Sequence, residues 1–133
     1  MKRALVMLLL LLLLASTACG ANSSGLSAST KLSVTVWPHG KSGRGVSYTL
    51  VCPRGTGTLP AAHSACSKLR RISIKAFAPV PAGTACTELY GGPQTARVAG
   101  HFAGKSIKAN FNRTNGCEIE RWSRLSFLFP LGK

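Results

Sequence analysis

Apolar and polar side chains alternate in two segments that follow residue 30 of the 133-residue chain. In the first segment Leu32, Val34 and Val36 alternate with polar residues, and residues 46–52 repeat the pattern. A period of two is typical of a strand that buries one face. The connecting residues 38–45 hold a proline and three glycines, which favour a turn. The two segments therefore predict an antiparallel hairpin.

Residues 59–71 predict a helix instead. Thr58 is placed to cap this helix, and Pro60 is tolerated in its first turn. Arg70 and Arg71 suit the negative end of the helix dipole.

The same helix would carry a cysteine on its buried face. Ala62, Cys66 and Leu69 are four and three residues apart and so share one side of a helix. A cysteine at this place can reach a strand beneath the helix, and Cys52 is the nearest candidate.

The second half of the chain predicts further strands. Residues 72–83 give a mixed signal, compatible with a short strand or with irregular structure. Residues 94–100 and 105–111 predict two strands with glycines at the bend between them, and residues 125–129 predict a last strand. Together these elements predict an α+β fold in which one or two helices lie on an antiparallel sheet.

The amino terminus has the pattern of an export signal. Two basic residues precede a short, leucine-rich apolar run, and small residues follow at 15–18. The run is too short for a stable membrane span, so we expect residues 1–18 to be a signal peptide that is removed. Cys19 follows directly, in a relaxed form of the bacterial lipoprotein cleavage site, and we expect it to be acylated. A plain secreted protein without this lipid is the alternative.

The number of cysteines supports the lipid anchor. The chain has five cysteines, and an exported protein with an odd thiol needs an explanation. With Cys19 as the lipid carrier, four cysteines remain for two disulfides in an oxidising compartment. Residues 19–30 are rich in Gly and Ser and predict a flexible tether that spans roughly 18 Å. Residues 31–133 are expected to form the one folded domain.

The charge of the chain narrows the choice of partners. It has 17 Lys and Arg against 3 acidic residues, and removing Lys2 and Arg3 leaves a formal charge of 15 − 3 = +12. In an exported protein such a field favours anionic membrane lipids or cell-wall polymers as neighbours. We expect no nucleic-acid partner.

The sequence provides little for catalysis. There is no Asp, and the three Glu and three His are scattered, so no carboxylate pair and no catalytic triad can be assembled from the pattern. The four later cysteines are 66 − 52 = 14, 86 − 66 = 20 and 117 − 86 = 31 residues apart, which is not the spacing of a zinc site. A phosphate-binding glycine loop is also missing. We therefore expect no enzyme, no metal and no cofactor.

Six short segments, taken in order and with their cysteine spacing, form a more specific pattern. They are YTLVC (48–52), GTLPAAHSACSKLR (57–70), the Cys86-x-x-x-Tyr90 pattern, VAGHFAGK (98–105), NGCE (115–118) and LSFLF (125–129). Together they resemble the Streptomyces subtilisin inhibitor family of bacterial serine protease inhibitors. The resemblance covers most of the chain after the tether.

This resemblance implies a structure and a partner. It implies a five-stranded antiparallel sheet with two helices packed on one face, and a homodimer formed through the sheet. It also implies disulfides that join Cys52 to Cys66 and Cys86 to Cys117. The expected partner is a subtilisin-type or trypsin-type serine protease.

The resemblance assigns roles within residues 84–93. The scissile bond would be Glu88-Leu89, with Glu88 in the specificity pocket of the protease. Ala85, Cys86 and Thr87 would contact the protease on the acyl side of this bond. The leaving side would consist of Leu89 and Tyr90.

Two further residues would support this loop. Through its disulfide to Cys86, Cys117 would clamp the loop, and the amide of Asn115 would brace it from behind. A loop that is already rigid loses little entropy on binding. The resulting hypothesis is a standard-mechanism inhibitor. The alternative is a cationic envelope lipoprotein on the same scaffold, which binds anionic cell-wall or membrane components and inhibits no protease.

Overall fold

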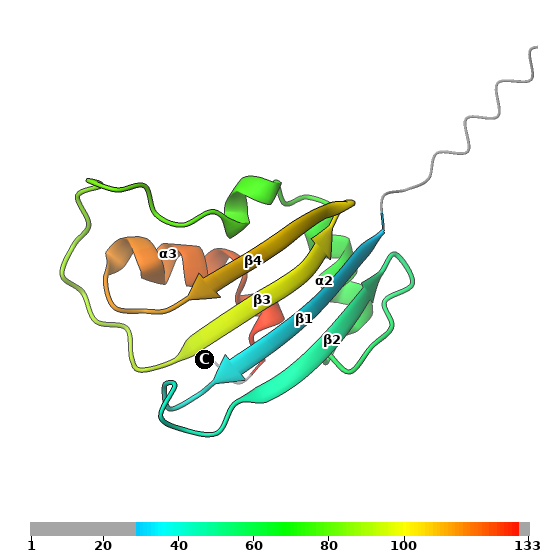
Figure 1. Ribbon diagram of the computed structural model, residues 1–133, viewed down its shortest axis with the longest axis horizontal. Coiled ribbons are helices and arrows are strands. Elements are labelled where there is room, and N and C mark those ends of the chain that lie inside the picture. Colours follow the sequence, from blue (N-terminus) through cyan, green and yellow to red (C-terminus); the bar gives the residue numbers. More distant parts are fainter. Residues whose placement is uncertain (1–28, 131–133) are drawn as a thin grey trace, which may run out of the picture.

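A four-stranded antiparallel sheet carries two α-helices on one face in the computed structural model, which describes residues 29–130 (Figure 1). Across the sheet the strands follow the order β2-β1-β3-β4. Their bounds are Thr30–Trp37 for β1, Val46–Cys52 for β2, Thr95–Phe102 for β3 and Lys105–Phe111 for β4. The helices are α2 (Ala62–Leu69) and α3 (Gly116–Arg124), and the short 3-10 helices are η1 (Ile74–Phe77) and η2 (Ser126–Leu128). The predicted signal peptide, Cys19 and residues 19–28 of the predicted tether lie outside the described residues.

The alternation of apolar and polar residues along the strands turns the apolar face of the sheet toward the helices. Leu32, Val34 and Val36 of β1 are buried, and their partners on β2 and β3 include Leu50 and Val98, which are also buried. Burying a side chain of this size contributes roughly 1.5–3 kcal/mol. The polar positions between them face away from the helices. The predicted alternation and the β1–β2 hairpin are therefore confirmed.

Helix α2 begins later than the sequence predicts. It starts at Ala62, after Ala61 has taken a left-handed conformation with φ of 53°. The hydroxyl oxygen of Thr58 accepts a hydrogen bond from the backbone N–H of Thr49, at 2.9 Å. Because this oxygen serves β2, the prediction that Thr58 caps the helix is wrong. The prediction that Cys66 lies on the buried face is confirmed.

Helix α3 forms where periodicity alone did not place an element. The side-chain oxygen of Asn115 caps it by accepting a hydrogen bond from the N–H of Glu118, at 3.0 Å. Glu118 in the first turn and Arg121 and Arg124 in the last turn match the helix dipole. Residues 72–83, whose pattern was mixed, form η1 and irregular structure.

The predicted fifth strand is wrong, because residues 125–129 turn into η2 instead of extending. Leu125 and Leu128 are three residues apart and both have an exposed fraction of 0%. The N–H of Leu128 donates to the carbonyl oxygen of Leu125, at 2.8 Å. Phe129 then reaches Trp122 with a ring-centroid distance of 4.6 Å. A 3-10 turn buries these three residues together, whereas a strand would place Leu128 on the opposite face.

Two disulfides join the elements in the pairing that the resemblance implies. Cys52 at the end of β2 is bonded to Cys66 of α2, and Cys86 is bonded to Cys117 of α3. Disulfides of this kind indicate an exported protein in an oxidising compartment. Among residues 29–130, no helix has the length and apolar character needed to cross a membrane.

Shortening a residue of η2 distinguishes the 3-10 turn from a strand. Leu128→Ala is expected to lower the free energy of unfolding by about 2–5 kcal/mol, because it empties a fully enclosed site. Phe127 is only half-buried, so Phe127→Ala should cost less although it removes more atoms. Urea unfolding of both variants measures the difference. A larger loss of unfolding free energy for Phe127→Ala than for Leu128→Ala would favour a strand over residues 125–129.

Candidate functional site

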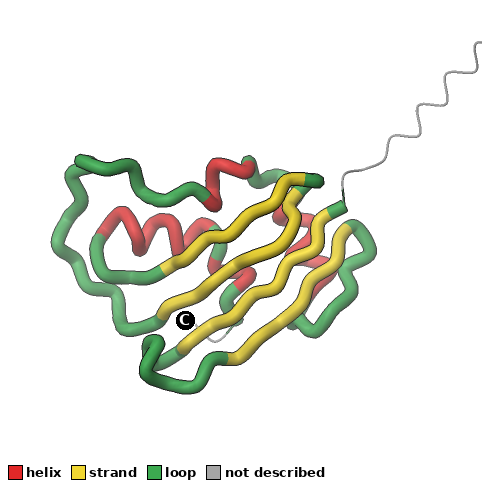
Figure 2. The backbone as a smooth tube through the Cα atoms, viewed as in Figure 1, coloured by secondary structure: helices red, strands yellow, loops and turns green. Residues whose placement is uncertain are grey.

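Residues 84–93 form an irregular segment between η1 and β3. The segment runs around the end of the molecule at which α3 begins (Figure 2). Most of its residues are exposed. Long segments without regular structure are mobile unless other contacts hold them.

A disulfide attaches this segment to α3. Cys86 is bonded to Cys117, the second residue of the helix, and their Cα atoms are 5.5 Å apart. Helix α3 is itself anchored to the core by Trp122, which is buried. The disulfide therefore couples the position of the exposed segment to the core.

Two backbone hydrogen bonds hold the segment on either side of its most exposed part. The N–H of Gly116 donates to the carbonyl oxygen of Thr87 at 2.9 Å, and the N–H of Gly91 donates to that of Arg113 at 2.7 Å. Between these two points lie residues 88–90, which are held from both sides.

Glycine is needed at both of these contacts. A Cβ atom on Gly116 would collide with the hydroxyl of Thr87. A Cβ atom on Gly91 would lie 2.9 Å from Cγ1 of Ile119 and 3.1 Å from Cβ of Arg113. These separations are shorter than an ordinary contact between carbon atoms. The segment and the start of α3 therefore approach more closely than larger residues would permit.

Residues 88–90 present their side chains to solvent. Leu89 is 62% exposed and Tyr90 is 68% exposed, so two adjacent large side chains with apolar surface lie in contact with water. Glu88 is also exposed, and its carboxylate has no hydrogen bond or ion pair among the described residues. It is therefore free to pair with a group from outside the chain.

The other two acids are already paired. Glu118 accepts a hydrogen bond from Arg121 at 2.6 Å, and Glu120 accepts one from Arg124 at 2.6 Å. The Glu118–Arg121 pair is mostly enclosed, and Arg121 also lies over the ring of Phe111. Of the three glutamates, only Glu88 is left without such a partner.

The support behind the segment consists of residues 112–115, between β4 and α3. The side chain of Asn112 accepts hydrogen bonds from the N–H and the hydroxyl of Thr114. The side chain of Arg113 donates to Gln94 at 3.0 Å, beside the start of β3. This turn fixes the carbonyl group to which Gly91 donates.

Asn115 lies in this support, and its side chain makes a different contact from the expected one. The resemblance implies that its amide braces the loop, whereas the hydrogen bond in the structure caps α3 through Glu118. At this place the direct bond to the loop comes from the backbone of Gly116. Asn115 acts on the loop by fixing the first turn of α3.

The structure brings together most of the residues that the sequence singled out. Ala85, Cys86, Thr87, Glu88, Leu89 and Tyr90 lie in one segment, against Asn115 and Cys117. The Cys52–Cys66 disulfide lies elsewhere, between β2 and α2, and Cys19 is outside the described residues. Sequence reasoning missed the supporting roles of Gly91, Arg113 and Gly116. Only Gly116, between Asn115 and a cysteine, had a neighbourhood that could have suggested one.

Comparison with known proteins adds no assignment. No family model matches the chain, and a search of curated proteins also finds no match. Among residues 29–130, His, Cys, Asp and Glu side chains do not gather in groups of three or more that could hold a metal ion. The function is therefore inferred from the geometry of the segment.

Removing the Cys86–Cys117 disulfide tests whether it holds residues 84–93 in place. In the double variant Cys86→Ser with Cys117→Ser, the free energy of unfolding should fall by about 4 kcal/mol. The amides of Gly91 and Gly116 should then exchange much faster relative to a core amide such as that of Val34. Exchange measured by NMR gives both ratios.

The matched control is Cys52→Ser with Cys66→Ser. It should lose about 3 kcal/mol and leave the exchange of Gly91 and Gly116 unchanged relative to Val34. If both double variants changed the amide exchange of these glycines equally, the Cys86–Cys117 disulfide would have no specific role in holding the segment.

Proposed function

We propose that the protein is an exported standard-mechanism inhibitor of subtilisin-like or trypsin-like serine proteases, similar to the Streptomyces subtilisin inhibitor family. The observation that carries this proposal is the exposed segment 88–90, fixed on both sides by backbone hydrogen bonds and beside a disulfide. Such a segment fits the requirement of this inhibitor class for an accessible but rigid peptide bond. The Glu88-Leu89 bond is the proposed reactive site.

Binding would use the main chain of the segment. An extended peptide adds as a strand to the edge of the protease cleft, and one side chain fills the specificity pocket. Ala85, Cys86 and Thr87 would lie on the acyl side, while Leu89 and Tyr90 would contact the leaving side. The exposed area of Leu89 and Tyr90 would be removed from water in the complex, which favours binding.

The chemistry would be a reversible acyl transfer. The serine oxygen of the protease attacks the carbonyl carbon of Glu88 and forms an ester, and the proton passes through the protease base to the amine of Leu89 as the peptide bond breaks. The two new ends of the inhibitor would not separate. The disulfide of Cys86 and the Thr87–Gly116 hydrogen bond hold one end, and the Gly91–Arg113 hydrogen bond holds the other.

Because the two chain ends stay together after cleavage, the protease would be inhibited and the chain would not be released as a hydrolysed product. The amine of Leu89 stays near the ester and can attack it again, which rebuilds the peptide bond and returns the proton. Proximity of this kind is worth an effective concentration many orders of magnitude above that of a free amine. Resealing therefore competes with hydrolysis and release.

Glu88 would set the specificity. Because its carboxylate has no partner within the described residues, it suits a pocket with positive charge or one wide enough to keep an acid hydrated. The field of the whole domain is positive, which would repel a basic protease and attract an acidic one. An acidic extracellular protease with a polar pocket is the proposed target.

The location of the protein in the cell is part of the same proposal. We expect Cys19 to anchor the protein to the cell membrane, with secretion without the anchor as the alternative. The homodimer through the open face of the sheet also stays a prediction, as do the absence of catalysis and of a cofactor. Binding to anionic cell-wall or membrane components without inhibition is the competing function, and the strong positive charge favours it.

Exchanging the residue in the pocket tests the inhibitor directly. The unmodified domain is expected to inhibit one of subtilisin, trypsin and a glutamate-specific protease at a one-to-one ratio. Glu88→Lys should raise the inhibition of trypsin relative to the other two proteases by at least about 100-fold. The reason is that the side chain in the specificity pocket decides which protease is bound. Residual protease activity at increasing inhibitor concentration measures both values.

The matched control is Glu120→Gln, which changes the charge of an exposed acid on α3, outside the exposed residues 88–90. It should inhibit as the unmodified domain does. Rapid cleavage after Glu88 with no inhibition would contradict the proposal and favour the competing function.

The lipid anchor has a separate test. Cells that produce the full chain should incorporate labelled palmitate into it, and Cys19→Ser should abolish the label. Unlabelled protein in the culture medium would place it in the secreted class.

A further inference from the structure

The end of the domain farthest from residues 88–90 has a strongly basic surface. Five exposed basic residues lie there, and we refer to them as the basic end: Lys31, Arg54, Arg70, Arg71 and Lys105. They come from four different parts of the sequence, so their clustering is a property of the fold.

The topology explains the clustering. Strand β1 begins where β2 ends, with Thr30 opposite Cys52, so Lys31 lies near the turn that holds Arg54. Strands β3 and β4 join at the same end, where Phe102 is paired with Lys105. The Cys52–Cys66 disulfide then places the last turn of α2, with Arg70 and Arg71 after it, beside this end of the sheet.

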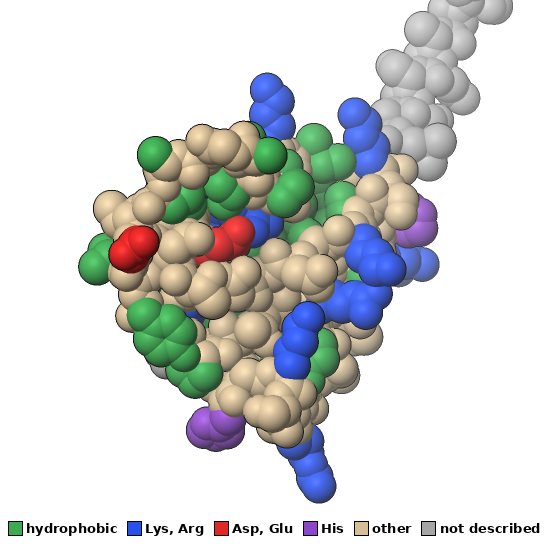
Figure 3. All heavy atoms as spheres, turned by 60° about the vertical axis from the view of Figure 1, so that its left-hand side comes forward, with side chains coloured by type: hydrophobic (Ala, Val, Ile, Leu, Met, Phe, Trp, Pro, Cys, Tyr) green, Lys and Arg blue, Asp and Glu red, His purple; other side chains and the backbone are tan. Residues whose placement is uncertain are grey.

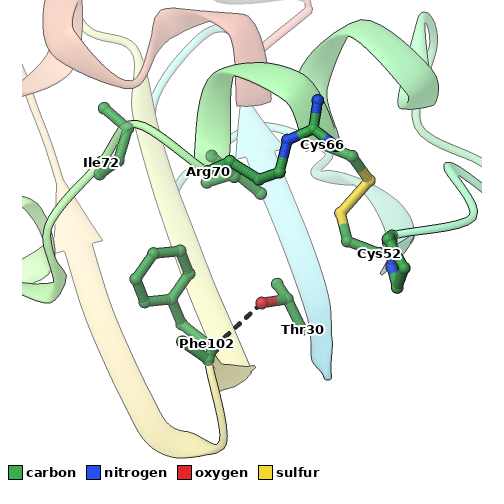
Figure 4. A pocket seen from close by; sticks show the side chains of 9 residues that line it. Thr30, Cys52, Cys66, Arg70, Ile72 and Phe102 are labelled. Atoms are coloured by element: carbon green, nitrogen blue, oxygen red, sulfur yellow. Dashed lines mark hydrogen bonds between the residues drawn. A yellow bond between two sulfur atoms is a disulfide. The ribbon is translucent and has the colours of Figure 1, made fainter. Parts of the chain in front are cut away.

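A shallow, mostly apolar cavity of about 320 Å³ opens at the basic end, beside Arg70 (Figure 4). Leu69, Ile72 and Phe102 contribute its apolar wall, and Arg70 lies at its rim. The hydroxyl of Thr30, beside Phe102, accepts a hydrogen bond from the N–H of Ala103. The basic end therefore combines an apolar cavity with exposed cationic side chains, of which Arg70 lines the cavity.

The basic end has no acidic residue to balance it. Glu88 lies in the segment at the other end, and Glu118 and Glu120 lie on α3, which starts beside that segment. Arg121 and Arg124 neutralise the two acids of the helix. In Figure 3 the acidic side chains lie to one side of the forward face, whereas most Lys and Arg side chains lie toward the other. All three acidic side chains therefore lie away from the basic end.

The chain enters the domain through this same basic end. Ser29, the first described residue, accepts a hydrogen bond from the N–H of Gly104 at 3.3 Å, in the turn between β3 and β4. Nine residues (20–28) separate it from Cys19, and the ten Cα–Cα steps between the two span at most about 35 Å even when fully extended. An acyl group on Cys19 would therefore keep the basic end close to the membrane surface.

We propose that the basic end docks on anionic lipid headgroups and so holds residues 84–93 away from the membrane. This inference rests on the proposed export and lipid anchor, and it does not require that the segment inhibits a protease. Arginine binds phosphate oxygens through two parallel N–H donors, and three of the five residues are arginines. Electrostatic attraction acts over about 8–10 Å at physiological salt, a distance that the short connection to Cys19 allows.

The lipid surface suits the basic end better than a cell-wall polymer does. The cavity gives part of this surface an apolar character, which matches the boundary between headgroups and acyl chains. At that boundary the basic side chains would bind the charged headgroups and the cavity would contact the acyl chains. A hydrated polymer would bind the basic side chains alone. Docking in this orientation would turn residues 88–90 toward the space in which a secreted protease diffuses.

Vesicle binding of the unlipidated protein tests the surface without help from the anchor. The chain from residue 19, with Cys19→Ser, is mixed with vesicles of equal parts phosphatidylglycerol and phosphatidylcholine, and binding is measured by co-sedimentation. It should bind these vesicles, release them at high salt, and not bind pure phosphatidylcholine. The triple variant Arg70→Gln, Arg71→Gln and Lys105→Gln should bind roughly 100-fold more weakly, since each charge near an anionic surface contributes about fivefold.

The matched control removes the same number of charges at the other end of the sheet: Lys41→Gln, Arg44→Gln and Arg97→Gln. Lys41 and Arg44 lie in the turn between β1 and β2, and Arg97 is paired with Thr35 near the end of β1. This control should lose less than about fivefold, because it keeps the basic end intact. Equal losses in the two variants would show that only the total charge matters and would overturn the proposal.

Hydrogen exchange of the bound protein tests the orientation. Peptides that contain residues 53–55 and 103–105 should gain protection on anionic vesicles, whereas residues 84–93 should not. Protection of residues 84–93 instead would overturn the orientation. Binding to a soluble anionic polymer such as teichoic acid but not to the vesicles would also overturn the proposal, in favour of the cell wall. None of these outcomes depends on protease inhibition, so the two proposals fail separately.

Discussion

The Cys86–Cys117 disulfide is the constraint on which the exposed end of this domain depends. It fixes residues 84–93 to the first turn of α3, and Asn115 caps that turn. Helix α3 is fixed in turn by Trp122, which packs on Phe129 with a ring-centroid distance of 4.6 Å. The core therefore holds the segment in place through α3 and the disulfide. Without the disulfide, two backbone hydrogen bonds, each worth about 1 kcal/mol, would have to hold it alone.

The sheet could be predicted from the sequence because alternation is a local signal, which is clearest in the buried positions of β1 and β4. The last segment could not. Leu125, Phe127 and Phe129 alternate as in a strand, but Leu125 and Leu128 also have the spacing of one 3-10 turn. Only the packing of Phe129 on Trp122 decides between the two. The start of α2 was misplaced for a related reason, because the side chain of Thr58 is used by β2.

The candidate site was predictable in part. The cysteine spacing and the resemblance singled out the loop and its neighbours, and the structure places these residues together. The contacts that stiffen the loop were not predictable, because Gly91 and Gly116 matter through close approach to residues distant in the sequence. Such contacts leave no periodic pattern. The basic end was hidden in the same way, since its charges come from four separate segments.

Taken together, these features describe a small domain with two different ends, one that exposes residues 88–90 between two backbone hydrogen bonds and one that exposes five basic side chains. The most direct test of the central claim is the state of the Glu88-Leu89 bond after long incubation with a protease that the domain binds. Mass spectrometry after reduction of the disulfides should show a stable mixture of intact and cleaved chain, with the same ratio reached from either pure form. Complete cleavage, with no return of the intact chain from the cleaved form, would contradict the account.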